Sequence, residues 1–534
     1  MQDYRHLRFL IVDDFSDFRS SLKAMLRDLG AGEVDSAEHG EGAIALCRQK
    51  RYDVILQDYN LGSGKNGQQV LEELHAAGLI SHQCVFIMVT AESSQAMVLS
   101  ALEHEPDGYL TKPFNRASLV QRLDKLLQRK ALLRPVLQAL DRREPAQVLS
   151  ACDRLSREDR RLLPLCQRYR AGALRELARH EELERLLRAV LADRAIPWAY
   201  QSLGKLLQTR GEYVQARQLY EQALQAFPLQ PGLYDGLAAA LAALGESGRA
   251  QQVLQDAVQL APLAIRRQAR LGGLALRNED FAVAARAYRQ AVQQGQHSRF
   301  HSPEYYLGLS QALLDGAGGE GLDKAAQAEI NQTLSELEQQ YPADPAVRVR
   351  AGLLQARSLQ RGGEPERAAQ VVAQALAGLQ QLEEFFAADT ALSLAGQLSQ
   401  LGQIEAAEQL LQSCVAIHGD DPAVLQGAAR LSRDPAILGR TREAVEFNRQ
   451  GVRAYQLGRF NDALELFRRA LALQPQNFSI ALNTAQSLLR QRGEQASPEL
   501  DAECRACLDV VRRMSPADPR YERYQQLCSK VFET

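Results

Sequence analysis

The chain has 534 residues, of which 46% are hydrophobic and 24% charged. This hydrophobic share is large enough to form packed cores, so disorder throughout the chain is excluded. The formal net charge of −2 argues against a general nucleic-acid binder, because such proteins neutralise backbone phosphates with excess basic residues. No uninterrupted run of about 18 apolar residues is present, so we expect no membrane insertion.

Cysteine usage and the first residues bear on the compartment. The eight cysteines are scattered through apolar patterns, as is typical of ordinary thiols in a reducing cytosol. The start of the chain has no long apolar segment followed by a cleavage site, so no signal peptide is expected. A cytoplasmic location is therefore expected.

Residues 1–130 alternate short apolar runs with amphipathic stretches. Such alternation predicts strands and helices of an α/β fold, a doubly wound parallel sheet of five strands with helices on both faces. The expected strands are Leu7–Val12, a weaker one at Glu33–Asp35, Asp53–Leu56, Val85–Val89 and Gly108–Leu110, and the expected helices include Ser16–Leu29, Gly40–Lys50 and Gly67–Ala77.

Polar residues follow these apolar runs where each expected strand ends. Asp13 and Asp14 follow the first run, Asp58 the third and Thr90 the fourth, and Lys112 follows the fifth. The carboxyl ends of parallel strands meet at one edge of a sheet, so these side chains should converge there. Clustered carboxylates repel one another unless a cation joins them, and hard oxygen ligands suit Mg²⁺.

This constellation resembles the receiver domain of bacterial response regulators, a flavodoxin-like domain, over residues 6–130. The resemblance rests on Asp13-Asp14, on Asp58 in Val-Ile-Leu-Gln-Asp-Tyr-Asn, on Thr90 in Met-Val-Thr-Ala, and on Lys112 in Tyr-Leu-Thr-Lys-Pro-Phe. It implies that Asp58 accepts a phosphoryl group with the help of Lys112. It also implies that Thr90 and Tyr109 form the switch that reads the phosphoryl group.

The resemblance further implies the cofactor, the partner and the fate of the phosphate. Mg²⁺ would bind Asp13, Asp14, Asp58 and the backbone carbonyl of Asn60. A histidine kinase or phosphotransfer protein would supply the phosphoryl group, and the protein would dephosphorylate itself without any other enzymatic activity. Asn60 and Glu92 imply a phosphoryl lifetime of minutes, and the Lys112–Pro113 bond is expected to be cis.

One loop departs from the family pattern. Receiver domains commonly have Met-Pro after the acceptor, whereas this chain has Gly62 in place of the proline and one residue more before Gly67. Glycine leaves the backbone freer than proline, so a more flexible loop is expected. No metal ligand is lost, so the chemistry should survive.

From about residue 131 onward the pattern is helical, with an internal period of 34 residues. Pro197, Pro231 and the region from 265 begin three copies, and a fourth lies at 444–475. Small residues recur where two helices would touch, with aromatics beside them. This resembles the tetratricopeptide repeat and implies an all-α solenoid that binds proteins.

The sequence predicts five segments. They are a receiver domain at 1–130, divergent helical repeats or linker at 131–196, tetratricopeptide repeats at 197–310, a glycine-containing insertion at 311–345, and further repeats with a cap at 346–534.

The inner helices of the first copies should line a concave groove for a protein partner. The expected groove positions hold polar, basic and aromatic residues: Trp198, Gln201, Lys205, Gln208, Arg266 and Arg277, with Arg270 one step away. A partly basic groove suits an acidic or carboxylate-ended peptide, because Arg and Lys pair with carboxylates.

The favoured interpretation is a response regulator whose phosphorylation on Asp58 controls protein–protein interactions of a repeat scaffold. One alternative is a transcription regulator with a DNA-contacting segment at 131–195, where 14 Arg stand against 10 Asp plus Glu, a net charge of +4. Acids interleave with those arginines, however, and nucleic-acid binding is not expected. Another alternative is a regulator of a partner enzyme such as a phosphatase. The sequence names neither the kinase nor the protein that binds the repeats.

Overall fold

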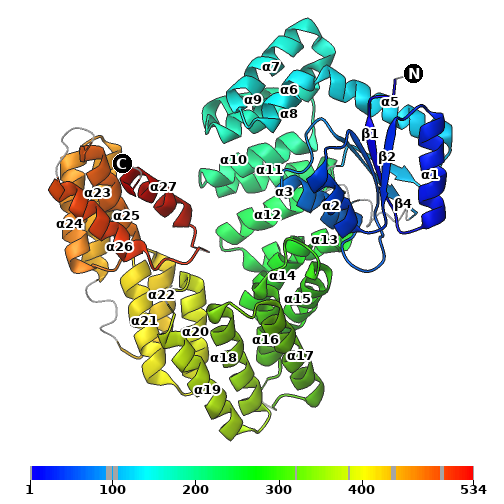
Figure 1. Ribbon diagram of the computed structural model, residues 1–534. Helices are drawn as coiled ribbons and strands as arrows, with labels where there is room; N and C mark the ends of the chain where they lie inside the picture. Colours follow the sequence, from blue (N-terminus) through cyan, green and yellow to red (C-terminus); the bar gives the residue numbers. More distant parts are fainter. Residues whose placement is uncertain are drawn as a thin grey trace. The chain divides into compact units, whose positions relative to one another are not determined.

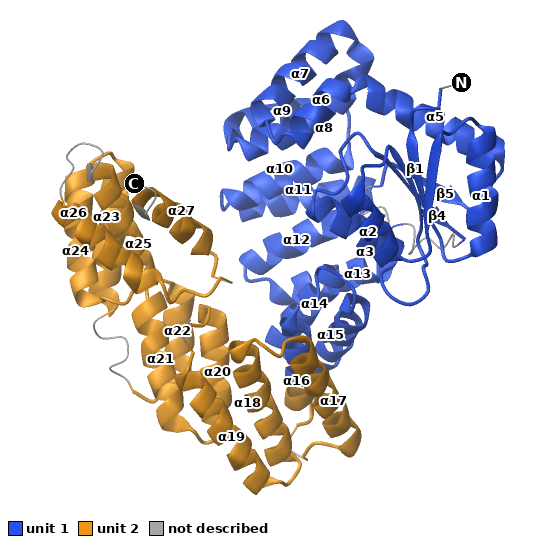
Figure 2. Ribbon diagram, in the orientation of Figure 1, with its two compact units in different colours: residues 1–312 blue, residues 313–534 orange. Residues whose placement is uncertain are grey.

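The computed structural model describes residues 3–91, 99, 106–318, 321–382, 385–434, 441–492, 498–516 and 518–532. The chain divides into two compact units, residues 1–312 and residues 313–534 (Figure 2). The first holds a five-stranded sheet followed by paired helices, and the second is built of helices in its described residues. Within the described part of the chain, no helix has the length and apolarity needed to cross a membrane.

The sheet is parallel and has the strand order β2-β1-β3-β4-β5. The order changes direction between β1 and β3, which places a crevice at the carboxyl ends of these two strands. The predicted doubly wound fold is confirmed. The strands are β1 (Arg8–Val12), β2 (Glu33–Ala37), β3 (Val54–Asp58), β4 (Val85–Thr90) and β5 (Gly108–Thr111).

Two apolar layers hold this sheet between its helices (Figure 1). Strands β3 and β4 are buried along their whole length, which explains their continuous runs of Val, Ile, Leu and Phe. On one face Leu22 and Leu123 pack against Phe9, and on the other Val70 packs with Leu10. The covering helices are α1 (Ser16–Asp28) and α5 (Arg116–Leu132) on the first face, and α2 (Gly40–Gln49) and α3 (Gly67–Ala76) on the second.

The helices after the sheet confirm the period of 34 residues. Helices α10, α12 and α14 begin at Pro197, Pro231 and Ile265, and each is followed by an outer partner. The helices of these three copies are α10 (Pro197–Thr209), α11 (Tyr213–Ala226), α12 (Pro231–Ala243), α13 (Ser247–Leu260), α14 (Ile265–Arg277) and α15 (Phe281–Gly295).

Aromatic rings fill the space that glycines leave between neighbouring helices. A Cβ atom added to Gly204 or to Gly236 would lie 2.3 Å from the ring of Tyr220, so the ring is held between α10 and α12. Phe467 meets Gly451 in the same way at 2.6 Å. The predicted pairing of small residues with aromatics is therefore confirmed as the contact that stacks the repeats.

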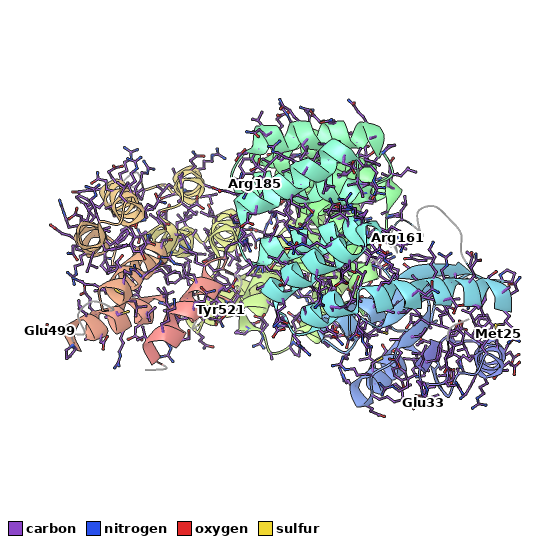
Figure 3. The ribbon with its side chains drawn as sticks, turned by 90° about the horizontal axis from the view of Figure 1, so that it is seen from above. Met25, Glu33, Arg161, Arg185, Glu499 and Tyr521 are labelled. Atoms are coloured by element: carbon purple, nitrogen blue, oxygen red, sulfur yellow. The ribbon has the colours of Figure 1, made fainter. Side chains whose placement is uncertain are left out.

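The segment 131–196 is helical, as expected. Its helices begin with α6, which follows α5 almost without interruption. In Figure 3 the labelled side chains Arg161 and Arg185 belong to this segment, and both are exposed. The elements are α6 (Arg134–Asp141), α7 (Pro145–Glu158), the 3₁₀ turn η1 (Arg160–Leu162), α8 (Leu163–Glu176) and α9 (His180–Asp193).

The expected insertion at 311–345 is mostly helical, so the extent of that prediction was wrong. Helices α16 (Pro303–Gly316) and α17 (Lys324–Gln340) occupy most of the range, and among its described residues only two short connections, after α16 and after α17, lack helix. The glycines interrupt the sequence period, but a short connection between two helices tolerates them without breaking the array.

The remaining helices continue the array through the second unit. The weaker copies expected near 349–380 and 388–418 are helical pairs, as is the copy at 444–475. These helices are α18 (Pro345–Arg361), α19 (Pro365–Gln380), α20 (Ala388–Gln400), α21 (Ile404–His418), α22 (Pro422–Leu431), α23 (Thr441–Gln456), α24 (Phe460–Leu473), α25 (Phe478–Arg492), α26 (Pro498–Val511) and α27 (Tyr521–Phe532).

The contact of Tyr220 with two glycines generates a prediction about stability. Gly204→Ala should lower the free energy of unfolding by about 1–3 kcal/mol, because the added methyl group overlaps the buried ring. Gly248→Ala is the matched control, since no atom lies within 4 Å of a Cβ there. Urea unfolding followed by circular dichroism compares the two. Equal transition midpoints would show that Tyr220 does not need the space at Gly204.

Candidate functional site

Three carboxylates converge at the carboxyl edge of the sheet. Asp13 and Asp14 follow β1, and Asp58 ends β3, the neighbouring strand in the sheet. One carboxylate oxygen from each lies within 4.8 Å of the others. Asp13 is 1% exposed and Asp58 is 6% exposed, while Asp14 is half-buried. Like charges this close in a buried position repel strongly, so the arrangement requires a cation.

Lys112 supplies one positive charge to this cluster. Its Nζ donates to Asp13 Oδ2 at 2.6 Å and to Asp58 Oδ2 at 2.7 Å. The lysine follows β5, and its backbone N–H donates to the carbonyl of Thr90 at the end of β4. Residues far apart in the sequence are thus joined by one buried ammonium group, as the sequence predicted.

Burial and the attraction between Asp58 and Lys112 have opposing effects on the pKa of each group. Burial raises the pKa of the Asp58 carboxyl above its usual range, although the hydrogen bond and charge of Lys112 act to lower it. Burial alone would lower the pKa of Lys112, but its hydrogen bonds and ion pairs with Asp13 and Asp58 raise that pKa above its ordinary value. The lysine therefore stays protonated beside the carboxylates.

The remaining predicted residues of the receiver surround this cluster. Thr90 ends β4 and is buried. The hydroxyl of Tyr109 is buried and has no hydrogen-bond partner among the described residues, so the ring already points inward in this structure. Asn60 is exposed in the loop after β3, and Glu92 lies outside the described residues. The Lys112–Pro113 bond is cis, so that prediction is confirmed.

The loop between β3 and α3 needs its glycines. Gly62 and Gly64 have φ values of +71° and +100°, in the region that favours glycine. The loop ends at Gly67, where an added Cβ would lie 2.2 Å from the carbonyl oxygen of Asp58. The first residue of α3 therefore packs directly on the backbone of the residue expected to accept phosphate.

Sequence reasoning missed two aromatic residues of the site. The Phe18 ring centroid lies 4.2 Å from Lys112 Nζ, and Phe18 packs edge-on against Phe114. A cation over an aromatic face is attracted to it, so Phe18 helps to hold the lysine. The position of Phe18 on the first turns of α1, one turn after the acidic pair, was the available signal.

The residues present fit a magnesium ion. Three carboxylates with oxygens within 4.8 Å of one another are a set that hard divalent cations prefer. Asp14 is the least buried of the three, and Lys112 donates to the other two, which leaves the Asp14 oxygens for a metal. The Asn60 carbonyl remains a predicted fourth ligand.

The predicted partner groove lies on the inner helices of the first repeats. A groove of about 750 Å³ is lined by residues from α10, α12 and α14, among them Lys205, Arg270 and Arg277. These three cations are exposed and form no ion pair with any described residue. Asp235, the acidic group in the groove, is instead bound by the buried Arg267 at 2.6 Å. The groove therefore has an excess of free positive charge.

One predicted groove residue lies elsewhere, and another lines a neighbouring hollow. Trp198 is half-buried at the start of α10 and does not line either hollow described on this face. Arg266 lines a second hollow of about 340 Å³ and lies over the ring of Phe300, 5.2 Å from its centroid. Lys205, Arg270 and Arg277 occur together in the larger groove, as predicted.

Comparisons with known families match both parts of the chain. A response regulator receiver domain model matches residues 9–124. Tetratricopeptide repeat models match residues 197–240, 270–345 and 448–518. The range 270–345 includes all of 311–345, in agreement with the helices found there.

The following relatives match the receiver part of the chain. The chemotaxis protein CheY-3 of Vibrio cholerae serotype O1 is 34% identical over 125 residues, which are 23% of this chain and 95% of the relative. The chemotaxis protein CheY of Pseudomonas aeruginosa is 32% identical over 123 residues, 23% of this chain and 98% of the relative. A solved structure of CheY4 from Vibrio cholerae is 28% identical, covers 23% of this chain and 98% of its own, and has a TM-score of 0.21.

The carboxylate cluster generates a prediction about metal binding. Asp14→Asn should weaken Mg²⁺ binding by about tenfold or more, because it removes one negative charge from the ligand set. Isothermal titration calorimetry on the full chain measures the Kd. Asp17→Asn is the control, since Asp17 is an exposed acid on α1 that lies outside the cluster. Equal affinities of the two variants would exclude Asp14 as a ligand.

Proposed function

Because the chain belongs to the response regulator family, we propose that Asp58 accepts a phosphoryl group and that this controls protein binding by the tetratricopeptide repeats. The observation that carries the proposal is the bridge from Lys112 Nζ to Asp13 and Asp58, beside a carboxylate set that fits Mg²⁺. Such a site neutralises an incoming phosphoryl group while keeping a carboxylate oxygen ready to attack it.

The residues divide the work between attack and charge neutralisation. A carboxylate oxygen of Asp58 attacks phosphorus, the bond from phosphorus to the donor nitrogen breaks, and the freed imidazole takes up a proton. Lys112 attracts the phosphoryl oxygens as negative charge accumulates there. A bound Mg²⁺ would offset the charge of the carboxylates and of the phosphoryl oxygens. Thr90 and Tyr109 are the proposed switch residues that respond to the product.

A histidine kinase or phosphotransfer protein is the proposed donor, because a receiver takes its phosphoryl group from a phosphohistidine. Such donors act in the cytoplasm, and we propose that location for this protein. The chain itself is proposed to have no enzymatic activity other than removal of its own phosphate. The relatives are named as chemotaxis proteins, and that role is theirs. Their length corresponds to the receiver without an array.

For the repeats, the groove of the first unit supports an acidic partner. Lys205, Arg270 and Arg277 present three unpaired cations on one concave surface. Charge-assisted hydrogen bonds to carboxylates are among the stronger polar interactions, and a concave site strengthens them further. We therefore propose that the partner inserts an acidic or carboxylate-ended segment there.

The second unit offers a less open surface at the repeats near 444–490. Arg523 of α27 donates to Asn483 at 2.8 Å and to Gln486 at 2.7 Å, both on α25. Asn483 in turn donates to Asn448 of α23. The chain's own α27 thus occupies polar groups that a partner would need, which favours the groove of the first unit.

DNA binding receives no support from the arginines of 131–195. Arg170 pairs with Asp153 at 2.9 Å, Arg179 with Glu182 at 2.6 Å, and Arg188 with Glu184 at 2.7 Å. Cations already paired with neighbouring acids are poorly placed to replace phosphate counterions. The interleaved acids noted in the sequence are therefore the partners of these arginines.

Phosphate should be found on Asp58 when the full chain is incubated with Mg²⁺ and acetyl phosphate. The acyl phosphate can be trapped chemically and mapped by mass spectrometry. Asp58→Asn should abolish labelling, and chelation of Mg²⁺ should do the same, because the clustered carboxylates exclude a dianion without a cation. Labelling of Asp58→Asn at the wild-type level would overturn the assignment. The phosphoryl group should decay within minutes, so a half-life of hours would contradict self-dephosphorylation.

The groove generates a second test. Replacing Lys205, Arg270 and Arg277 together with Ala should weaken binding of an oligoglutamate peptide by about tenfold or more and reduce its dependence on salt. A variant with Ala at Lys125, Arg175 and Arg286 removes the same charge from exposed positions outside the groove. Fluorescence anisotropy gives the affinities, and circular dichroism verifies folding. Equal loss in both variants would indicate attraction to net charge alone.

A further inference from the structure

The receiver and the repeats of the first unit meet through α3 (Figure 1). Lys65 Nζ donates to the carbonyl of His297 at 2.7 Å, and Gln69 Nε2 donates to the carbonyl of Gln294 at 3.1 Å. Ser298 Oγ donates to Glu72 Oε2 at 3.4 Å. The receiver therefore contacts the last turn of α15 and the residues that follow it, through the first two turns of α3 and through Lys65, the residue before the N-cap of α3.

The same face of α3 forms one end of the partner groove. The hollow of about 340 Å³ is lined by Gln68 and Glu72 of the receiver together with Arg266 and Arg270 of α14. It shares lining residues with the larger groove, so the two hollows are continuous. The shared residues are Gln201, Gly232, Asp235 and Arg270.

The carboxylate of Glu72 lies in the hollow beside Arg266 and Arg270, where an acidic partner segment would bind. Its side chain is 8% exposed, and burial raises its pKa despite the opposing charges of Arg299 and Arg266. The acidic group that faces the arginine end of the groove is thus the receiver's own. A partner's acidic segment and α3 therefore compete for one electrostatic environment.

Asp58 is in direct contact with the start of α3, the helix that lines this end of the groove. Gly67 opens α3, its N–H donates to the carbonyl of Tyr59 at 2.8 Å, and its Cα leaves no room for a Cβ beside the carbonyl of Asp58. A displacement of the Asp58 backbone on phosphorylation would therefore be passed to the start of α3. That displacement acts directly on Gln69 and Glu72, within two turns of Gly67.

The described hydrogen bonds of this contact are made by side chains. Lys65 and Gln69 donate to backbone carbonyls and Glu72 accepts from one hydroxyl, so these bonds can break without unfolding α3 or the array. A phosphoryl group adds about −1.5 to −2 charges at Asp58, beside the start of α3.

A second contact keeps the receiver attached elsewhere. Asp141 of α6 accepts from Ser81 Oγ at 2.5 Å and from the His82 backbone N–H at 2.8 Å. These residues precede β4, so they lie at the amino edge of the sheet, away from Asp58. One contact is therefore remote from the phosphorylation site and the other adjoins it.

We infer that α3 is a phosphorylation-controlled gate of the groove: it closes the end beside Arg266 and Arg270 while Asp58 is unmodified, and phosphorylation withdraws it so that an acidic partner segment reaches those arginines. The inference rests on the proposed phosphorylation of Asp58 and on the groove as the partner site. The contact at Asp141 holds the receiver in both states.

Hydrogen–deuterium exchange of the full chain tests the gate. With Mg²⁺ and acetyl phosphate, amides of 294–300 and of α3 should exchange about fivefold faster or more, while those at 81–83 stay unchanged. Asp58→Asn should show no change. Mass spectrometry of the same samples reports labelling. Labelled Asp58 with unaltered exchange at 294–300 would overturn the gate and leave the proposed function standing, whereas absent labelling would overturn both.

A variant opens the gate without phosphate. Lys65→Ala with Gln69→Ala removes both hydrogen bonds to the 294–297 carbonyls, and unphosphorylated protein should then bind the oligoglutamate peptide about fivefold more tightly or better. The rise would occur although the variant loses a positive charge. The control, Lys125→Ala with Gln128→Ala, removes a matched exposed pair on α5 and should bind like wild type. Unchanged or weaker binding by the first variant, with native circular dichroism, would overturn the gate.

Discussion

The buried ammonium group of Lys112 is the interaction on which the receiver depends. It bridges Asp13 and Asp58, which come from neighbouring strands, and it reaches them from the far side of β4. Without it, two nearly inaccessible carboxylates would face each other in a medium of low polarity, which is costly. The positive charge of Lys112 offsets the repulsion between these carboxylates, and the same charge would attract a phosphoryl group. Lys112 therefore serves both the stability of the site and the proposed chemistry.

The repeats obey a different constraint, which is steric. Tyr220 occupies space that Gly204 and Gly236 leave open on two successive inner helices, and no side chain larger than glycine fits there. Because one ring fixes the spacing of two helices, the inner faces stay aligned over several repeats. The alignment is what brings Lys205 and Arg270, 65 positions apart in the chain, onto a single concave surface.

The sequence was sufficient to predict the strands and the site residues at their ends, because local patterns and strand order determine both. Asp13, Asp58 and Lys112 stand at or just after the ends of strands. The position of each strand could be predicted because short apolar runs alternate with amphipathic stretches along the sequence. It could not predict contacts that depend on packing between distant segments. The side chain of Phe18 over Lys112 and the absence of Trp198 from the groove depend on helix rotation, and the helices of 311–345 were obscured by glycines that occupy only a short connection.

Two of the receiver's contacts with the array differ in what they can transmit. Asp141 binds the His82 backbone and the Ser81 side chain at the amino edge of the sheet, where strands begin and which lies opposite the carboxylate cluster. The α3 contact begins at Gly67, which touches the Asp58 carbonyl, and ends at Glu72, which faces the arginines of α14. Phosphorylation of Asp58, at the start of α3, would therefore change the charge and the free volume beside the arginines of α14, which Glu72 of α3 faces. This coupling requires no long pathway, because the phosphoacceptor and the groove are separated by two helical turns.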